Sequence, residues 1–291
     1  MSRVLVALIA VLQLSSLALA YQKDVDLNLA MRYVELSGAS YCADPKLKRN
    51  SVDDWSCNVC SNYPNMTAKS FYNSKYSCSG FVGYDADTNE IVVAFAGTDP
   101  LSIRDWIDDL VFVKEDYPYC DGCDVHKGFY ETFLSVEATI KEFVYDWLDL
   151  YPSASIAIVG HSLGAALAAH CTAEFTHVGG KLKDQLHAVY TYGMPRVGND
   201  AFQSWYKETM FGTFRFTHRK DPVPHLPPIE FDFHHIPYEV FYTEDYNDYT
   251  LCSFEGEDES CADQYTVAVD LVNHLNYLDF DFTTNYLSCG L

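Results

Sequence analysis

The sequence predicts an α/β fold with a mostly parallel central sheet and helices on both faces. Segments with strand character alternate with segments of helical periodicity over most of the chain, as in parallel sheets. Residues 156–159 are apolar throughout, which is typical of a strand buried on both faces. The 291 residues and 48% hydrophobic content suffice for one large core, so we expect a single domain.

The first elements rest on local patterns. Leu27, Met31 and Val34 lie near helical spacing and predict a helix over residues 24–39. Residues 42–78 contain cysteines among turn-forming residues and are expected to form loops. The runs 81–84 and 91–95 are strand-like and are joined by the turn-like DADTN.

The later elements supply the alternation of helix and strand. Apolar residues repeat at three- and four-residue steps from Phe129 to Trp147 and predict a long helix that ends before Pro152. Further strands are expected at residues 156–159, 187–192 and 213–217, and further helices at about 163–175 and 200–209.

The first twenty residues are expected to be a secretory signal peptide. Arg3 precedes an apolar run over residues 4–12, and small residues occupy the positions that signal peptidase reads at 18–20. Nine apolar residues are too few to span a bilayer, so an uncleaved anchor is the weaker alternative. We therefore expect a soluble, secreted, extracellular chain with one domain over residues 21–291.

Ten cysteines fit an oxidising export route. Two pairs bracket only two residues and resemble half zinc sites, but they lie too far apart for a zinc ribbon, so short disulfides are the better interpretation. The expected pairs are Cys57 with Cys60, Cys120 with Cys123, Cys252 with Cys261, and Cys42 with Cys289, which leaves Cys78 and Cys171 over.

The formal net charge of −22 limits the partners. Such a surface repels nucleic acid and anionic lipid and favours a neutral or zwitterionic substrate. Asn65 begins the tripeptide Asn-Met-Thr, a glycosylation acceptor expected on an exposed loop.

The segment IAIVGHSLGAALAAH, residues 156–170, carries the strongest functional signal. It places G-x-S-x-G between an expected strand and an expected helix, the context in which this pattern presents a nucleophilic serine. Gly160 and Gly164 allow a tight turn, and the alanines that follow let the helix approach the sheet. A purely structural turn explains the glycines but does not require Ser162.

A serine nucleophile requires a histidine base and an acid that orients it. Asp221 follows an expected strand within a proline-rich loop, although an aspartate that starts a turn before proline is an equally common interpretation. His274 is the favoured base because it lies in the C-terminal part, where a loop can return to the sheet. His225 is only four residues from Asp221, and the adjacent pair His234-His235 abuts a strand-like segment.

Acyl transfer also requires two donors for the oxyanion. The backbone N–H of Leu163 at the helix N-terminus is one candidate, and Thr98, in AGTD after the strand over 91–95, is the other. This mechanism uses no cofactor and no metal. A metal site of His225, His234 and His235 is a poorer interpretation because the spacing matches no common site.

Seven segments in order resemble the fungal-type class 3 lipases: VVAFAGTD, SIRDWIDDL, VHKGFYETF, GHSLGAALA, TYGMPRVGN, FTHRKDPVPHLPP and HLNYL. The resemblance covers roughly residues 78–278 and implies an α/β-hydrolase fold. It assigns Ser162 as nucleophile, Asp221 as orienting acid and His274 as base. It places the oxyanion donors at Thr98 and Leu163. The acidic insert over residues 254–260 has no counterpart role in the family.

The same resemblance implies a short lid helix within residues 101–110, here called the lid segment. Apolar residues lie among charged ones in this segment, as a lid that exposes an apolar face at a lipid surface requires. Related feruloyl esterases have a more polar segment here. The proposed lid residues are Leu101, Ile103, Trp106, Ile107 and Leu110.

The sequence thus predicts a secreted triacylglycerol lipase that acts on lipid esters at an oil–water or neutral membrane interface, without stable membrane insertion. Phospholipase A1 and feruloyl-type esterase activities are the alternatives among enzymes. A rival outside the enzymes is an inactive lipid-binding protein that keeps the scaffold.

Overall fold

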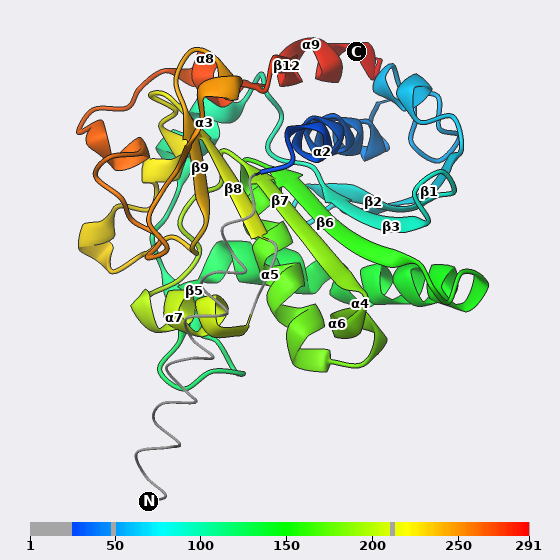
Figure 1. The fold of residues 1–291 in the computed structure, drawn as a ribbon, viewed down its shortest axis with the longest axis horizontal. Helices are drawn as coiled ribbons and strands as arrows, with labels where there is room; N and C mark the ends of the chain where they lie inside the picture. Colours follow the sequence, from blue (N-terminus) through cyan, green and yellow to red (C-terminus); the bar gives the residue numbers. More distant parts are fainter. Residues whose placement is uncertain (1–24, 48–50, 210–212, 291) are drawn as a thin grey trace, which may run out of the picture.

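The computed structural model describes residues 25–47, 51–209 and 213–290. The signal peptide expected at residues 1–20 lies outside these ranges. The described chain forms a central sheet between two layers of helices (Figure 1).

The eight-stranded sheet has the order β1-β2-β3-β6-β7-β8-β9-β10. Pairs from β3 through β6, β7 and β8 to β9 are parallel, whereas β1, β2 and β3 pair antiparallel, as do β9 and β10. The predicted mostly parallel sheet is therefore confirmed. The strands are β1 (Met66–Asn73), β2 (Cys78–Asp85), β3 (Glu90–Phe95), β6 (Ser155–His161), β7 (Leu186–Tyr192), β8 (Thr213–His218), β9 (Glu239–Tyr242) and β10 (Thr250–Leu251).

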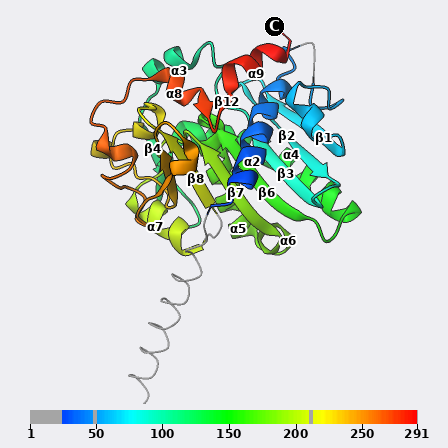
Figure 2. The same ribbon diagram turned by 45° about the horizontal axis from the view of Figure 1, so that its top comes forward.

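Helices cover both faces of the sheet, with α4 and α5 on one side and α2 on the other (Figures 1 and 2). The predicted helices are present, although Met31 points to solvent and the buried side of α2 is formed by Ala30, Tyr33 and Val34. The helices are α2 (Leu27–Ala39), α3 (Ile103–Asp109), α4 (Lys127–Leu150), α5 (Leu163–Val178), α6 (Lys181–Asp184), α7 (Asp200–Thr209), α8 (Leu271–His274) and α9 (Phe282–Ser288). Short strand pairs are β4 (Lys114–Asp116) with β5 (Asp124–His126), and β11 (Asn276–Tyr277) with β12 (Phe280–Asp281).

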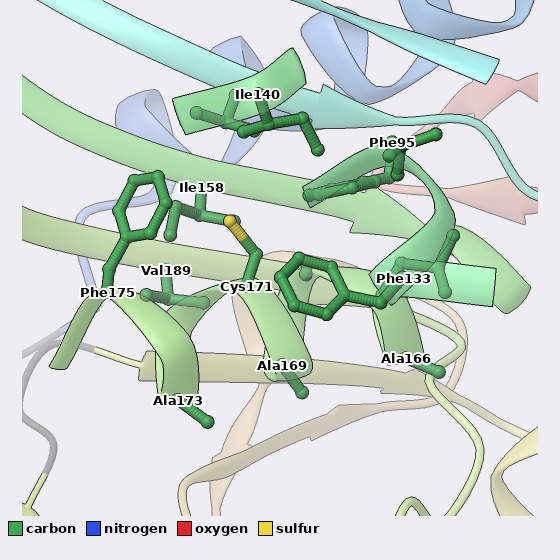
Figure 3. Packing of buried hydrophobic residues seen from close by; sticks show 14 of the residues in the cluster. Phe95, Phe133, Ile140, Ile158, Ala166, Ala169, Cys171, Ala173, Phe175 and Val189 are labelled. Carbon is green, nitrogen blue, oxygen red and sulfur yellow. The ribbon is translucent and has the colours of Figure 1, made fainter. Parts of the chain in front are cut away.

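The sheet separates two hydrophobic cores because successive side chains of a strand point to opposite faces. Val93 and Phe95 of β3 pack on the side of α4 and α5, whereas Val92 and Ala94 pack on the side of α2. Figure 3 shows the first core, where Phe95 and Phe133 lie near Cys171 of α5. Burial of each large apolar side chain stabilises the fold by about 1.5–3 kcal/mol.

The prediction of loops over residues 42–78 is wrong in part, because β1 occupies residues 66–73 at the edge of the sheet. Only Met66, Ala68 and Phe71 of this strand are buried. Lys69 and Ser70 interrupt the alternation of apolar and polar residues, and pairing with β2 supplies the order that the local pattern lacks.

The four predicted disulfides are present: Cys42–Cys289, Cys57–Cys60, Cys120–Cys123 and Cys252–Cys261. Cys78 and Cys171 are buried thiols. Within the described ranges, no helix combines the length and the apolar character needed to cross a bilayer.

Candidate active site

Ser162 occupies a one-residue turn between β6 and α5. Its φ of 58° and ψ of −129° lie in a region that residues with a side chain rarely adopt. The turn holds because the Ser162 N–H donates to Tyr192 O at 2.9 Å and its carbonyl accepts from Ala165 N–H at 3.0 Å. The strand and the helix therefore force the backbone into a strained conformation at the serine.

The two glycines of the motif are required by close backbone approach. A β-carbon added to Gly160 would collide with the backbone of Gly164, and one added to Gly164 would collide with the carbonyl oxygen of Phe95. The predicted need for small residues at both positions is thus confirmed. Without them, α5 could not begin immediately beside β3.

The structure brings Ser162, His274 and Asp221 into one hydrogen-bonded row. Ser162 Oγ lies 2.9 Å from His274 Nε2. His274 Nδ1 lies 2.9 Å from Asp221 Oδ2 and 3.0 Å from Oδ1. Exposure is 0% for Ser162 and His274 and 2% for Asp221. This is the arrangement by which an imidazole can take a proton from an alcohol while a carboxylate holds its tautomer.

Asp221 accepts two further hydrogen bonds. Val223 N–H donates to Oδ1 at 2.8 Å, which is the turn contact expected of an aspartate before proline. The Tyr277 hydroxyl donates to Oδ2 at 2.6 Å. Burial and the Asp221 charge raise the pKa of Tyr277, so its proton stays in place. Both interpretations of Asp221, as turn residue and as partner of histidine, hold at once.

Tyr277 was missed at the sequence level, although it lies three residues after His274 in the segment HLNYL. The loops that carry the acid and the base are also joined directly. Asp270 N–H donates to Lys220 O at 3.1 Å, and Lys220 N–H donates to Asn273 Oδ1 at 3.2 Å. These bonds fix α8 beside the loop that follows β8.

Thr98 and Leu163, the predicted oxyanion donors, line the same cavity of about 680 Å³. Thr98 follows β3, and Leu163 is the first residue of α5, where the helix dipole favours negative charge. The loop that contains Gly97 and Thr98 packs against the serine, because a β-carbon added to Gly97 would lie 2.9 Å from Ser162 Cβ. Thr98 follows Gly97 and Leu163 follows Ser162, so the two predicted donors belong to segments that meet at the serine.

The lid segment forms the predicted short helix, α3, over Ile103–Asp109. Ile103 is buried, and Trp106, Ile107 and Leu110 are half-buried. Trp106 stacks on Phe129 with ring centroids 6.3 Å apart and lines the cavity with Leu110. Leu101 differs from the others, since it is 60% exposed.

The other histidines considered above face separate partners. His235 Nε2 donates to Pro224 O at 2.7 Å, His234 lies 3.5 Å from Asp232, and His225 lies 3.9 Å from Asp263. In the part of the chain that the structure describes, one group of potential metal ligands is close enough to hold an ion. It consists of Glu239 with Cys252 and Cys261, whose sulfurs are bonded to each other.

The acidic insert has a structural role that the sequence did not reveal. Arg196, which is 4% exposed, binds the Glu257 carboxylate through two hydrogen bonds of 2.9 Å and contacts Asp263 at 3.2 Å. The backbone N–H of Arg196 donates to the backbone carbonyl oxygen of Leu226 at 2.7 Å. The insert thus holds the loop that begins at Asp221. Burial, together with the neighbouring Glu257, raises the pKa of Asp263 to about 7.

Asn65 lies at the surface immediately before β1, and its side-chain amide donates to Asp87 at 2.9 and 3.1 Å. Thr67, two residues later, is also exposed. The first and third residues of the acceptor tripeptide are therefore accessible from solvent, whereas Met66 between them is buried.

Comparison with known proteins identifies relatives of this chain. The family model described as lipase (class 3) matches residues 92–231. A lipase of Rhizomucor miehei is 31% identical over 87% of this chain and 68% of its own length. A secreted mono- and diacylglycerol lipase 1 of Fusarium solani is 32% identical over 70% of this chain, which spans 61% of that relative.

A solved structure is similar over almost the whole described chain. It is described as a triacylglycerol lipase whose catalytic centre is formed by a serine protease triad. It shares 31% identity and a TM-score of 0.78, and the match covers 89% of this chain and 97% of that one.

Proposed function

Since the chain belongs to the class 3 lipase family and is therefore a carboxylic ester hydrolase of acylglycerols, we propose that Ser162 is its nucleophile, His274 its base and Asp221 the orienting acid. The observation that carries this assignment is the hydrogen-bonded row from Ser162 Oγ through His274 to Asp221. The related structure with a serine protease triad supports it.

In the proposed mechanism, His274 Nε2 takes the proton of Ser162 as the hydroxyl oxygen attacks the ester carbonyl. The N–H groups of Thr98 and Leu163 hold the resulting oxyanion. His274 then protonates the leaving alcohol, and an acyl group remains on Ser162. Water enters, His274 takes its proton, and the same steps release the fatty acid.

We further propose that the lid segment must move for substrate to enter. Ser162 and His274 are fully buried, so no ester reaches the hydroxyl in this conformation. Trp106 and Leu110 border the cavity that Thr98 and Leu163 line. Outward movement of α3 would open this cavity and expose apolar side chains to a lipid surface.

Exposed apolar side chains support an oil–water or neutral membrane interface as the place of action. They flank α3 and the segment that carries His274, and α3 and α8 lie near each other in Figures 1 and 2. Valines 267, 269 and 272 are 67%, 74% and 73% exposed. The exposed residues of these segments are Leu101, Val111, Val267, Val269 and Val272. The exposed Phe231 adds to them, since its ring lies 5.4 Å from that of Phe112, next to Val111.

We also propose that the protein acts outside the cell after removal of residues 1–20. Four disulfides agree with an oxidising compartment. A relative that carries the word secreted in its name agrees as well.

A substrate panel tests the proposed activity. Purified protein is assayed on emulsified triacylglycerol, phosphatidylcholine and methyl ferulate. We expect the highest kcat/KM on acylglycerols. Ser162→Ala should lose about a million-fold in rate. Preferred hydrolysis of phosphatidylcholine or ferulate, or substantial hydrolysis by Ser162→Ala, would contradict the proposal.

The interfacial proposal has its own test. The rate should rise sharply above the solubility limit of a short-chain triacylglycerol. Val269→Ser and Val272→Ser should weaken this rise, while Leu150→Ser serves as a matched control. Leu150 is 67% exposed at the end of α4, which lies far from α8 (Figure 1). A smooth rate curve for the unmodified protein would argue against interfacial action.

A further inference from the structure

His161, which precedes Ser162, is a buried histidine whose two ring nitrogens bind a tyrosine hydroxyl and the backbone carbonyl of His274. Its Nε2 lies 2.8 Å from His274 O, and its Nδ1 lies 2.7 Å from the Tyr41 hydroxyl. A carbonyl oxygen can only accept a hydrogen bond, so Nε2 carries the proton. Nδ1 therefore accepts from the Tyr41 hydroxyl.

Tyr41 connects this imidazole to the loop that contains Thr98. The Tyr41 hydroxyl oxygen lies directly against Gly97. A β-carbon at Gly97 would collide with that oxygen, so the loop passes directly over it. The result is a connection in which the Tyr41 hydroxyl contacts Gly97 and donates to His161 Nδ1, and His161 Nε2–H donates to the backbone carbonyl of His274. Hydrogen bonds arranged in one direction strengthen one another.

Packing around His161 leaves its ring little freedom. Phe282 stacks on it at 3.7 Å between ring centroids, with the ring planes 12° apart. The ring of His274 lies 4.7 Å away. Phe282 begins α9, and the Cys42–Cys289 disulfide joins the end of this helix to the residue after Tyr41.

We propose that Tyr41 and His161 are positioning residues that hold the oxyanion loop and the backbone of His274 at a fixed distance from each other. Oxyanion donors must lie within about 2.7–3.1 Å of the developing charge, and the base must lie within hydrogen-bond reach of the serine. These two requirements involve segments that are far apart in sequence. The Tyr41–His161 chain joins them, and the inference rests on the proposed function of Ser162 and His274.

His161 acts in this role as a neutral donor and not as a second base. Burial, followed by the neighbouring His274, lowers the pKa of His161 well below its usual range. A positive His161 would oppose the imidazolium that forms on His274 during each acyl-transfer step. The neutral ring keeps the hydrogen bond without adding that repulsion.

Two substitutions test the proposal. Tyr41→Phe removes the hydroxyl that links Gly97 to His161. His161→Leu removes both of the ring's hydrogen bonds, whereas His161→Gln keeps an N–H that can reach His274 O. The substrate is a soluble short-chain ester, so the measured rate does not depend on opening of the lid segment at a lipid surface. A fluorophosphonate titration counts reactive serines, and kcat is expressed per reactive site.

We expect Tyr41→Phe to lower kcat about tenfold and His161→Leu about a hundredfold, since misplacement of reacting groups by about 1 Å costs about that much. KM should change less than about twofold. His161→Gln should recover at least part of the loss. This split between kcat and KM, with partial rescue, is not expected of a residue that only stabilises the fold.

Tyr33→Phe is the matched control. Tyr33 is also buried, and its hydroxyl donates to Glu90 at 2.7 Å, at the start of β3 and away from Ser162. We expect it to lower the melting temperature while kcat stays within about twofold. A kcat for Tyr41→Phe equal to that of Tyr33→Phe would overturn the proposal, even if His161→Leu fails to fold. Lack of ester hydrolysis by the unmodified protein would instead refute the proposed function.

Discussion

Replacement of Asp221 by asparagine changes one atom of the site and tests the proposed role of its charge. The carboxylate accepts from His274 Nδ1, from the Tyr277 hydroxyl and from Val223 N–H. An amide has one accepting oxygen and one donating NH2 group. If its oxygen keeps the bond to Val223, its NH2 group faces both Tyr277 and His274 Nδ1.

The new NH2 group is a donor, so it changes which nitrogen of His274 carries the proton. The NH2 group replaces the nearer oxygen, at 2.9 Å from Nδ1, while the remaining oxygen, at 3.0 Å, already accepts from Val223. This favours an accepting Nδ1, which shifts the proton of His274 to Nε2, the nitrogen that faces Ser162. A protonated Nε2 cannot take the proton of the serine. We expect kcat to fall by about 10⁴-fold, which corresponds to about 5 kcal/mol of lost transition-state stabilisation.

The assay measures kcat on a soluble ester, together with the melting temperature. Asp85→Asn is the matched control, because Asp85 is also 2% exposed and pairs with Arg32 at 2.8 Å on β2. This control should lose stability but keep its kcat. A folded Asp221→Asn variant that retains more than about a tenth of the activity would show that the Asp221 charge does not set the tautomer of His274.

Three further predictions concern stability and modification. Replacement of Cys42 and Cys289 by serine should lower the urea midpoint, because this disulfide joins residues 247 apart and the chain-entropy model gives about 5 kcal/mol for such a loop; an unchanged midpoint would contradict this. The raised pKa of Asp263, about 7, means that the folded state keeps a proton that the unfolded chain releases near pH 4. Asp263 should therefore contribute stability that is lost as pH rises from about 4 to about 7, and Asp263→Asn should remove this contribution in urea titrations at several pH values; a pH dependence identical to that of the unmodified protein would count against it. Secreted protein should shift in mass on enzymatic deglycosylation, and Asn65→Gln should abolish that shift; a shift that persists would place the glycan elsewhere.

Local signals were sufficient for much of the fold and of the site. The turn at Ser162 requires glycine at both flanking positions, and such steric needs are visible in five residues of sequence. The long helix α4 and the apolar strand β6 carry clear periodicity. His274 was favoured because a C-terminal loop can return to the sheet, and the family resemblance assigned the same residue, although periodicity did not distinguish it from a structural histidine.

The remaining features depend on contacts between distant segments. The strand β1 becomes ordered only by pairing with β2. Tyr277 and His161 have no local mark of function, because their partners lie 56 and 120 residues away. From sequence alone, the insert around Glu257 resembles a solvated acidic loop. The structure shows that Glu257 binds Arg196. Charge and hydrophobicity along the chain contain no information on such pairings.

Covalent labelling identifies the nucleophile and its dependence on His274 in one experiment. The unmodified protein is treated with a fluorophosphonate, digested, and analysed by mass spectrometry. We expect a single labelled peptide with the phosphonyl group on Ser162, no label in Ser162→Ala, and labelling slowed by at least about a hundredfold in His274→Ala. A label on another residue, or an unchanged rate in His274→Ala, would contradict the assignment of nucleophile and base.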